Sequence, residues 1–315
     1  MKYHIVRHEK KRGLIQEEKQ VRSGFVTIVG RPNAGKSTLL NHILGTKVAI
    51  VSDKPQTTRN SIRGIYNTDD MQVVFIDTPG VHKPKHKLDE RMMADVHESL
   101  SGGDIIVYLV ETQESFGRGE EYIIRQLSEV KKPVFLLINK IDLIEPQKLL
   151  PLIDRLKDRY SFAEIIPISA QRGTNVDRFL EVLKQYLPLG PRFYPQGMTS
   201  DQPEQLFMAE LIREQVLGLT RDEIPHSVAV NISQMEERAN GTLYLEAVIY
   251  VERETQKGIV IGKRGALLKA IGIAARAEME KFFACNVYLE LRVKTKKDWR
   301  DNERLLQDWD LLGKE

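Results

Sequence analysis

Residues 30–37 have the sequence Gly30-Arg31-Pro32-Asn33-Ala34-Gly35-Lys36-Ser37, and the rest of the chain is arranged around them. The apolar run 25–29 before them predicts a buried strand, and the stretch 38–44 after them predicts a helix. Glycines at such a junction let backbone N–H groups curl around phosphate oxygens, with the positive end of the helix facing the same anion. Lys36 can reach the terminal phosphates and Ser37 is placed to bind Mg²⁺. The stretch from Gly30 to Thr38 therefore predicts a nucleoside triphosphate site.

The composition is that of an ordinary soluble protein. With 315 residues, of which 41% are hydrophobic, the chain has room for two domains. The single cysteine, Cys285, excludes an internal disulfide framework and a cysteine metal site, which fits a reducing cytosol. No apolar run is long enough for a membrane span, and no signal peptide is apparent at the start. We therefore expect a cytoplasmic protein.

Short apolar runs alternate with helix-period stretches from residue 25 to residue 187. This rhythm predicts an α/β domain in which a mostly parallel sheet is covered by helices and ligands bind at the carboxyl ends of the strands. The expected strands are 25–29, 73–76, 105–110, 134–138 and 165–168, and the expected helices include 119–130, 146–160 and 175–187.

The chain divides into four parts. Residues 1–22 predict a mobile basic arm; an RNA-touching extension and an ordinary disordered tail both stay open. Residues 23–187 form the predicted nucleotide-binding domain, and the proline- and glycine-rich stretch 188–203 is the expected linker. Residues 204–315 have the order α-β-β-α-α-β and end in a helix, which predicts an α+β domain with helices on one side of a small sheet.

Two short motifs identify the base as guanine. Asp142, in Asn139-Lys140-Ile141-Asp142, carries a carboxylate that only accepts hydrogen bonds, so it matches the ring N–H and the amine of guanine. Lys140 can lie along the base, and Asn139 can tie this loop to the phosphate loop. Ser169-Ala170-Gln171 would offer the Ala170 N–H to the guanine oxygen.

Two further segments would bind Mg²⁺ and the γ-phosphate. In Asp77-Thr78-Pro79-Gly80, Asp77 would meet Mg²⁺ through water, and the Gly80 N–H would meet the γ-phosphate. One threonine of Gln56-Thr57-Thr58-Arg59 would complete the metal shell, and spacing alone leaves Thr57 and Thr58 open.

The motifs GRPNAGKS, QTTR, DTPG, NKID and SAQ, in this order, resemble the G-domain of the translation-factor-related GTPases. Gly258–Gly265 and Leu268–Gly272 resemble the KH domain of the bacterial Era GTPases, so the resemblance covers about residues 23–306. It implies hydrolysis of GTP to GDP and phosphate, and it favours Thr58 over Thr57 as the metal ligand. The expected catalytic residues are Asn33, Lys36, Thr58, Asp77 and Gly80.

Val81 follows Asp77-Thr78-Pro79-Gly80, at the position where Ras-like GTPases have a glutamine that orients the attacking water. Valine cannot orient water, so we expect hydrolysis to be slow or assisted from elsewhere. The resemblance implies that Asn33 binds K⁺ beside the phosphates; alternatively, Asn33 only braces the loop. We expect Arg59 to be a solvent-exposed switch residue rather than an arginine finger.

The segment from Lys257 to Lys297 contains ten basic and three acidic residues, which indicates an anionic partner. Within it Gly262-Lys263-Arg264-Gly265 joins two predicted helices, as in a type II KH domain; the alternative is an ordinary helix-turn-helix corner. Lys263, Arg264 and Lys269 would contact RNA phosphates, while Ile259, Val260 and Ile261 would line an apolar groove. Whether Arg292, Lys294, Lys296 and Lys297 contact RNA or only solvate a strand stays open.

The resemblance implies a GTP-switched protein that binds the 3′ end region of 16S rRNA and acts in 30S ribosomal subunit assembly. We expect a monomer with no DNA partner, and peripheral association with the inner face of the cell membrane stays open. The alternative is a signalling or membrane-associated GTPase switch whose C-terminal domain docks a protein. An ATP-driven kinase is disfavoured by Asn139 and Asp142.

Overall fold

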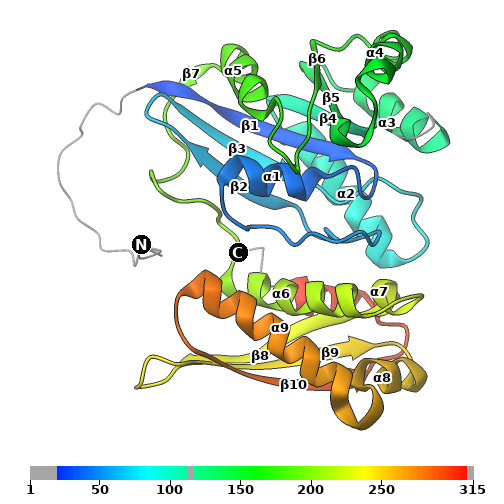
Figure 1. The fold of residues 1–315 in the computed structure, drawn as a ribbon, viewed down its shortest axis with the longest axis vertical. Coiled ribbons are helices and arrows are strands. Elements are labelled where there is room, and N and C mark those ends of the chain that lie inside the picture. Colours follow the sequence, from blue (N-terminus) through cyan, green and yellow to red (C-terminus); the bar gives the residue numbers. More distant parts are fainter. Residues whose placement is uncertain (1–19, 113–116, 311–315) are drawn as a thin grey trace.

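The structure is a computed structural model that describes residues 20–112 and 117–310. It contains an N-terminal domain, from β1 to β7, and a C-terminal domain, from α6 to α10, which lie one above the other in Figure 1. The expected mobile arm, 1–22, mostly falls outside the described residues. Its last two residues, Val21 and Arg22, already belong to β1, so the first domain begins earlier than expected.

The N-terminal domain is a sheet between two layers of helices. Strand order is β2-β3-β1-β4-β5-β6; β2 is antiparallel to β3, the other pairs along this path are parallel, and β7 pairs with the start of β1. Helices α1 and α5 pack on one face, and α2, α3 and α4 pack on the other. The elements are β1 Val21–Gly30, α1 Lys36–Leu44, β2 Ile62–Asn67, β3 Met71–Asp77, α2 Lys87–Gly102, β4 Ile105–Glu111, α3 Arg118–Ser128, β5 Val134–Asn139, α4 Leu149–Lys157, β6 Glu164–Pro167, α5 Val176–Tyr186 and β7 Leu189–Gly190, with short 3-10 helices Ile141–Leu143 and Pro146–Lys148.

The predicted α/β fold is confirmed, and the motifs that begin at Gly30, Asp77, Asn139 and Ser169 lie at the carboxyl ends of parallel strands. The motif Gln56–Arg59 lies instead in the loop between α1 and β2. The unpredicted elements of this domain include β2 and α2. Strand β2 lies at the sheet edge, and α2 begins a few residues after Gly80. The α2 signal was present, because Leu88, Met92, Val96 and Leu100 recur every four residues and are all buried.

The expected linker runs along the N-terminal domain. The Gln72 side chain accepts hydrogen bonds from the backbone N–H groups of Phe193 (2.6 Å) and Tyr194 (3.0 Å). Further on, the Ile65 N–H donates to the Thr199 carbonyl at 2.9 Å. These contacts fix the linker against β2 and β3, so they also fix where the second domain begins.

The C-terminal domain has a three-stranded sheet in the order β10-β9-β8, with β10 parallel and β8 antiparallel to β9. Alternate residues such as Leu245 and Ile249 point toward α6 and α9 and form its core. The elements are α6 Glu204–Leu219, α7 Ile224–Ser227, β8 Ala229–Glu237, β9 Leu243–Val251, α8 Glu254–Ile261, a 3-10 turn Lys263–Gly265, α9 Ala266–Phe283, β10 Val287–Thr295, a 3-10 turn Trp299–Asp301 and α10 Glu303–Asp310. The predicted α-β-β-α-α-β order is confirmed.

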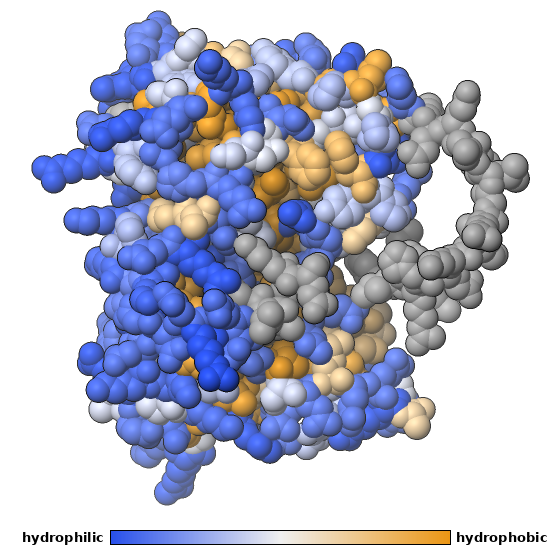
Figure 2. Space-filling view, turned by 180° about the vertical axis from the view of Figure 1, so that it is seen from behind, coloured by the Kyte–Doolittle hydropathy of each residue, from blue (hydrophilic) through white to orange (hydrophobic). Residues whose placement is uncertain are grey.

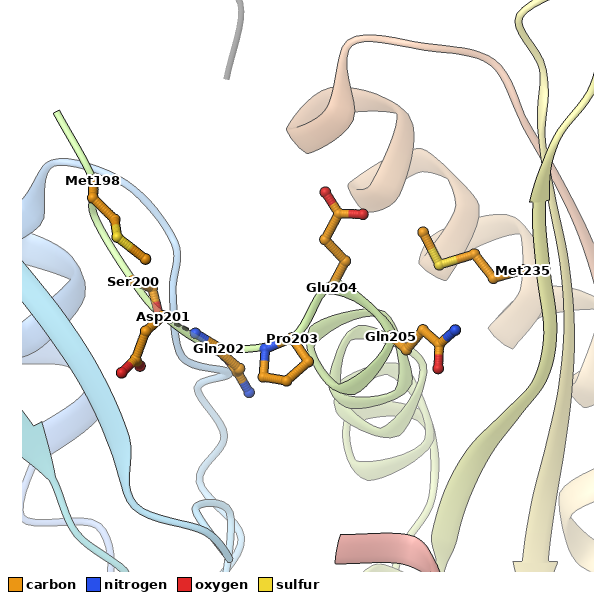
Figure 3. Close-up of a pocket in the computed structure, with 8 residues that line it drawn as sticks. All are labelled: Met198, Ser200, Asp201, Gln202, Pro203, Glu204, Gln205 and Met235. Atoms are coloured by element: carbon orange, nitrogen blue, oxygen red, sulfur yellow. Dashed lines mark hydrogen bonds between the residues drawn. The ribbon is translucent and has the colours of Figure 1, made fainter. Parts of the chain in front are cut away.

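The two domains share hydrophobic and polar contacts. Trp299 of the C-terminal domain belongs to the same buried cluster as Met92 of α2. Lys87, at the start of α2, pairs with Glu303 of α10 at 2.7 Å. The cavity drawn in Figure 3, of about 450 Å³, also lies at this junction, between the linker, the start of α6 and Met235 of β8. It contains none of the predicted nucleotide or RNA residues.

Figure 2 draws the face of the molecule opposite to that in Figure 1. Hydrophilic residues dominate this face, and hydrophobic residues are visible between them in limited patches. Among the described helices, none is both long enough and apolar enough to cross a membrane.

Candidate nucleotide and RNA sites

The phosphate loop lies between β1 and α1, as predicted. Gly35 has φ +98°, and a Cβ at this position would lie 2.3 Å from Nδ2 of Asn139, so only glycine fits. Lys36 is buried, and its Nζ donates to the carbonyls of Gly30 (3.3 Å) and Arg31 (3.1 Å). Burial lowers the pKa of Lys36, while the Asp77 carboxylate partly offsets this. The ammonium group is therefore held over the loop.

Three predicted metal ligands meet beside this loop. The Ser37 hydroxyl lies 2.6 Å from Oδ2 of Asp77 and 2.9 Å from the Thr58 hydroxyl. Thr57 instead donates to the Lys54 carbonyl at 2.6 Å, so the geometry favours Thr58, as the resemblance did.

This group of oxygens fits a hard divalent cation. Burial raises the pKa of the fully buried Asp77, although Lys36, Ser37 and Thr58 each act in the opposite direction. The other carboxylate oxygen of Asp77, Oδ1, is buried and has no hydrogen-bond partner among the described residues. Two hydroxyls and a buried carboxylate with an unused oxygen form a donor set suited to Mg²⁺.

Asn139 joins the two base-binding loops to the phosphate loop. Its Nδ2 donates to the Ala34 carbonyl at 2.8 Å, and its Oδ1 accepts the Ala170 N–H at 2.9 Å. The first contact is the predicted one. The second involves the Ala170 N–H that was predicted to face the guanine oxygen, and that role stays a prediction.

The remaining base-site residues have neighbours that the sequence did not predict. Lys140 pairs with Glu111, at the end of β4, at 2.7 Å. Asp142 lies 3.7 Å from the exposed Arg172, and its own side chain is mostly buried. Ser169 is buried, whereas Gln171 is exposed. Glu111 directly follows a predicted strand, which is the signal that could have identified it.

Not every predicted nucleotide residue points into the site. The Thr78 hydroxyl donates to the Ile28 carbonyl at 2.8 Å inside the sheet, so its side chain is unavailable to a ligand. Arg31 reaches Glu120 of α3 at 3.5 Å, and Thr38 continues α1. Pro79 and Gly80 are buried against the phosphate loop, where a Cβ at Gly80 would lie 2.7 Å from the Pro32 nitrogen.

Val81 and Asn33 differ in how they relate to the predicted K⁺ site. Val81 is buried in the cluster with α2, and its N–H donates to the Gly30 carbonyl at 3.0 Å. Asn33 is exposed, and its Nδ2 donates to the Asp53 carbonyl at 2.7 Å. Asn33 therefore links the phosphate loop to the loop that carries Thr58.

The expectation that Arg59 is solvent-exposed is wrong. Its Nη1 donates to the Val228 carbonyl at 2.7 Å, and its guanidinium lies 5.5 Å from the ring centroid of Trp299. Nε and Nη2 are buried without a hydrogen-bond partner among the described residues. Burial, followed by the charge of Arg213, lowers the pKa of Arg59 to about 9. Arg59 thus belongs to the contact between the domains, which no local pattern could reveal.

The GxxG segment lies at an exposed corner of the C-terminal domain. Gly262 has φ +73°, and a Cβ there would lie 2.7 Å from Cβ of Leu267, so the turn requires glycine. Lys263 and Arg264, within the turn, and Lys269, on α9, are all exposed. Gly265 then precedes α9 in a left-handed conformation. The three cations are thus available to phosphate groups.

The apolar residues beside this turn differ from the expectation at one position. Val260 is fully buried in the domain core and cannot line a groove. Successive helical residues point about 100° apart, so three in a row cannot face one side. Ile259 is 48% exposed and Ile261 is half-buried, while Ile273 of α9, which was not predicted, is 52% exposed.

The four basic residues near the end of the chain are not equivalent. Arg292 pairs with Glu246 at 2.9 Å and with Glu290 at 2.8 Å on the outer face of the sheet. Lys294, Lys296 and Lys297 are exposed. This favours solvation or strand pairing for Arg292 over contact with phosphates.

Comparison with known proteins gives a match for each domain. Residues 25–140 match the family described as 50S ribosome-binding GTPase, and residues 223–300 match the KH domain family. Two solved structures are each 40% identical to this chain, with a TM-score of 0.89, and each match covers 92% of this chain. One is a point variant of Aquifex aeolicus Era bound to GDP·AlF4⁻, covered over 99% of its length, and the other is Era in complex with MgGDPNP and nucleotides 1506–1542 of 16S ribosomal RNA, covered over 98%.

Because these two matches cover 92% of the chain at 40% identity, they extend across both domains. This protein therefore belongs to the Era family of GTPases.

Proposed function

We propose that this GTPase binds the 3′ end region of 16S rRNA through its KH domain and acts in assembly of the 30S ribosomal subunit, in the cytoplasm. The observation that carries the proposal is the likeness, over 92% of the chain, to an Era structure that holds MgGDPNP and nucleotides 1506–1542 of 16S rRNA. The exposed Lys263, Arg264 and Ile259 beside the GxxG turn support it, because KH domains use such a turn to bind about four nucleotides of a single strand.

In the proposed reaction, Lys36 and the phosphate-loop N–H groups hold the β- and γ-phosphates, and the Gly80 N–H contacts the γ-phosphate. Ser37, Thr58 and Asp77 hold Mg²⁺, Asp77 through water; the ion neutralises charge on the transferred phosphoryl group when bound. Asp142 selects guanine, and Asn139 keeps the base loops in register with the phosphate loop. This division of roles fits the oxygens that converge beside Ser37.

We also propose that hydrolysis is stimulated by K⁺ bound at Asn33. Buried Val81 provides no hydrogen-bonding side chain to orient water, so charge at the transition state has to be stabilised by other groups. Asn33 supports the proposal because its side chain lies where the phosphate loop meets the loop that carries Thr58, with its Nδ2 donating to the Asp53 carbonyl. GTP turnover should be faster in KCl than in NaCl at equal ionic strength. Equal rates would leave Asn33 as a brace between the loops.

The RNA proposal is tested by electrophoretic mobility shift with an RNA spanning nucleotides 1506–1542. Lys263→Asp combined with Arg264→Asp should abolish binding, because two phosphate contacts become repulsive. The matched control is Lys83→Asp combined with Lys85→Asp, two exposed lysines of the N-terminal domain. Undiminished affinity of the GxxG variant would refute the proposal and would favour a C-terminal domain that docks a protein.

A further inference from the structure

The loop between α1 and β2, which carries Thr58, lies against one face of α6. Figure 1 shows α6 on the side of the KH domain that faces the G-domain. Glu210, Arg213 and Glu214 share that face, because residues three and four positions apart are neighbours on a helix. Glu214 accepts the Val51 N–H at 3.0 Å, and Ile50 packs into the KH core. The start of the loop is thereby fixed to the KH domain.

Arg213 holds the loop nearer to its catalytic end. Its side chain is 1% exposed, and its guanidinium donates to the backbone carbonyl of Thr57 and, at 3.5 Å, to that of Gln56. Glu210 fixes the orientation of this guanidinium, with Nε to Oε1 at 2.7 Å and Nη2 to Oε2 at 2.5 Å. A paired guanidinium of this kind is a rigid, directional donor.

Thr58 lies between two residues that the KH domain holds. The carbonyl of Thr57 accepts from Arg213, and the Arg59 side chain donates to the Val228 carbonyl. The Thr58 side chain points the other way, toward Ser37 and Asp77. Any displacement of the KH domain would therefore be transmitted to the Thr58 hydroxyl through its two neighbours.

We propose that Arg213 is a positioning residue for GTP hydrolysis. By holding the carbonyls of Gln56 and Thr57, it places the Thr58 hydroxyl where Mg²⁺ binds, so the RNA-binding domain completes the GTPase site. The inference rests on the proposed role of Thr58 as a metal ligand.

The test compares Arg213→Met with wild type in the full-length protein. Loss of hydrogen bonds from a charged donor should lower kcat and the affinity for Mg²⁺ and a non-hydrolysable GTP analogue by about ten- to a hundredfold. Affinity for GDP should stay within about twofold of wild type, because GDP lacks the γ-phosphate next to which Thr58 would bind Mg²⁺. Arg213→Lys should recover part of the loss. The matched control, Arg221→Met, changes an exposed arginine just beyond α6 and should behave as wild type.

A double-mutant cycle with Thr58→Ala shows whether Arg213 acts through Thr58. Once Thr58 is alanine, Arg213→Met should cause little further loss of kcat. Additive losses, or equal weakening of GDP and GTP-analogue binding, would overturn the inference while leaving the role of Thr58 intact. If Thr58→Ala alone has no effect on kcat, the proposed role of Thr58 fails, and the inference fails with it.

A loss of folding in Arg213→Met would be recognised by thermal unfolding. In that case Glu210→Gln provides the decisive variant, because it retains the guanidinium and removes the charge that orients it. Glu210→Gln should lower kcat and the affinity for the GTP analogue, each by a smaller factor than Arg213→Met does, and should leave GDP binding unchanged. Wild-type kcat in Glu210→Gln would then overturn the inference.

Discussion

Asn139→Ala should weaken binding of GDP and of GTP analogues to the same extent. Asn139 is 2% exposed and makes two hydrogen bonds, to the Ala34 carbonyl and from the Ala170 N–H, and both alanines are buried. Alanine at 139 leaves one acceptor and one donor without a partner. In the Asn139→Ala variant without nucleotide, the loops that carry Ala34 and Ala170 can separate, and water can then bind the two unpaired groups. Nucleotide binding requires these loops to be close together. The free-energy cost of the two unpaired groups therefore lowers the affinity for nucleotide.

The size of the effect follows from those two groups. Each buried unsatisfied group costs about 1–3 kcal/mol, so the pair should cost about 2–6 kcal/mol, and the dissociation constant should rise at least about thirtyfold. Asn139→Asp should be at least as weak a binder, because it can accept from Ala170 but sets a carboxylate against the Ala34 carbonyl.

The assay is fluorescence titration with methylanthraniloyl derivatives of GDP and of a non-hydrolysable GTP analogue. Asn286→Ala, at an exposed site in the KH domain, is the matched control and should bind as wild type. GDP affinity of Asn139→Ala within twofold of wild type would refute the reasoning. A loss confined to the GTP analogue would also refute it, since the hydrogen bonds of Asn139 join the base loops to the phosphate loop, which GDP and GTP both need.

Four further substitutions test burial and charge. Val260→Asp should lower the unfolding free energy by about 3–5 kcal/mol because it buries an unpaired carboxylate. Ile259→Asp, at an exposed position, should change the unfolding free energy by less than about 0.5 kcal/mol and should weaken RNA binding. Equal stabilities of the two variants in urea would contradict the burial of Val260 and the exposure of Ile259. Burial, then the charge of Arg59, lowers the pKa of His226, so the folded state binds this proton more weakly than the unfolded state does. Unfolding free energy should therefore fall as pH drops below about 6.5, and His226→Gln should flatten that slope; an unchanged slope would contradict the role of His226. Arg59→Met should lower the unfolding free energy by less than about 1 kcal/mol, because it removes a buried guanidinium with two unpartnered nitrogens; a loss above about 2 kcal/mol would contradict this.

The nucleotide site was largely predictable because its geometry is local. Four of its motifs, all except Gln56–Arg59, follow parallel strands, and the carboxyl ends of such strands meet at one edge of the sheet. The order of the strands did not have to be known for Ser37, Asp77 and Asn139 to be placed together. Spacing could not separate Thr57 from Thr58, however, because that choice depends on the path of the loop between α1 and β2.

The errors concern residues whose environment is set by distant parts of the chain. Arg59 is 169 positions from Val228, whose carbonyl it contacts, so nothing near it in sequence indicates burial. The prolines and glycines of the linker predict a connection between domains, but nothing in them indicates the contact with Gln72, whose side chain accepts the Phe193 N–H. The error for Val260 does not depend on distant parts of the chain. Successive helical residues point about 100° apart, so Ile259, Val260 and Ile261 cannot all line one groove.

If Arg213 positions Thr58 as proposed, the contacts between α6 and the Thr58 loop link nucleotide state to the orientation of the KH domain. If GTP orders that loop, the KH domain is held in one position, and RNA that favours this position must in turn favour GTP. The coupling is reciprocal, so it can be measured from either side.

The most direct measurement is the affinity of full-length protein for the 1506–1542 RNA fragment, with GDP bound and with a non-hydrolysable GTP analogue and Mg²⁺ bound. We predict that the two dissociation constants differ by about fivefold or more, the usual lower range of allosteric coupling, and that Arg213→Met reduces the difference. Equal affinities in both nucleotide states, with RNA bound at the GxxG surface, would contradict the coupling of GTP to RNA.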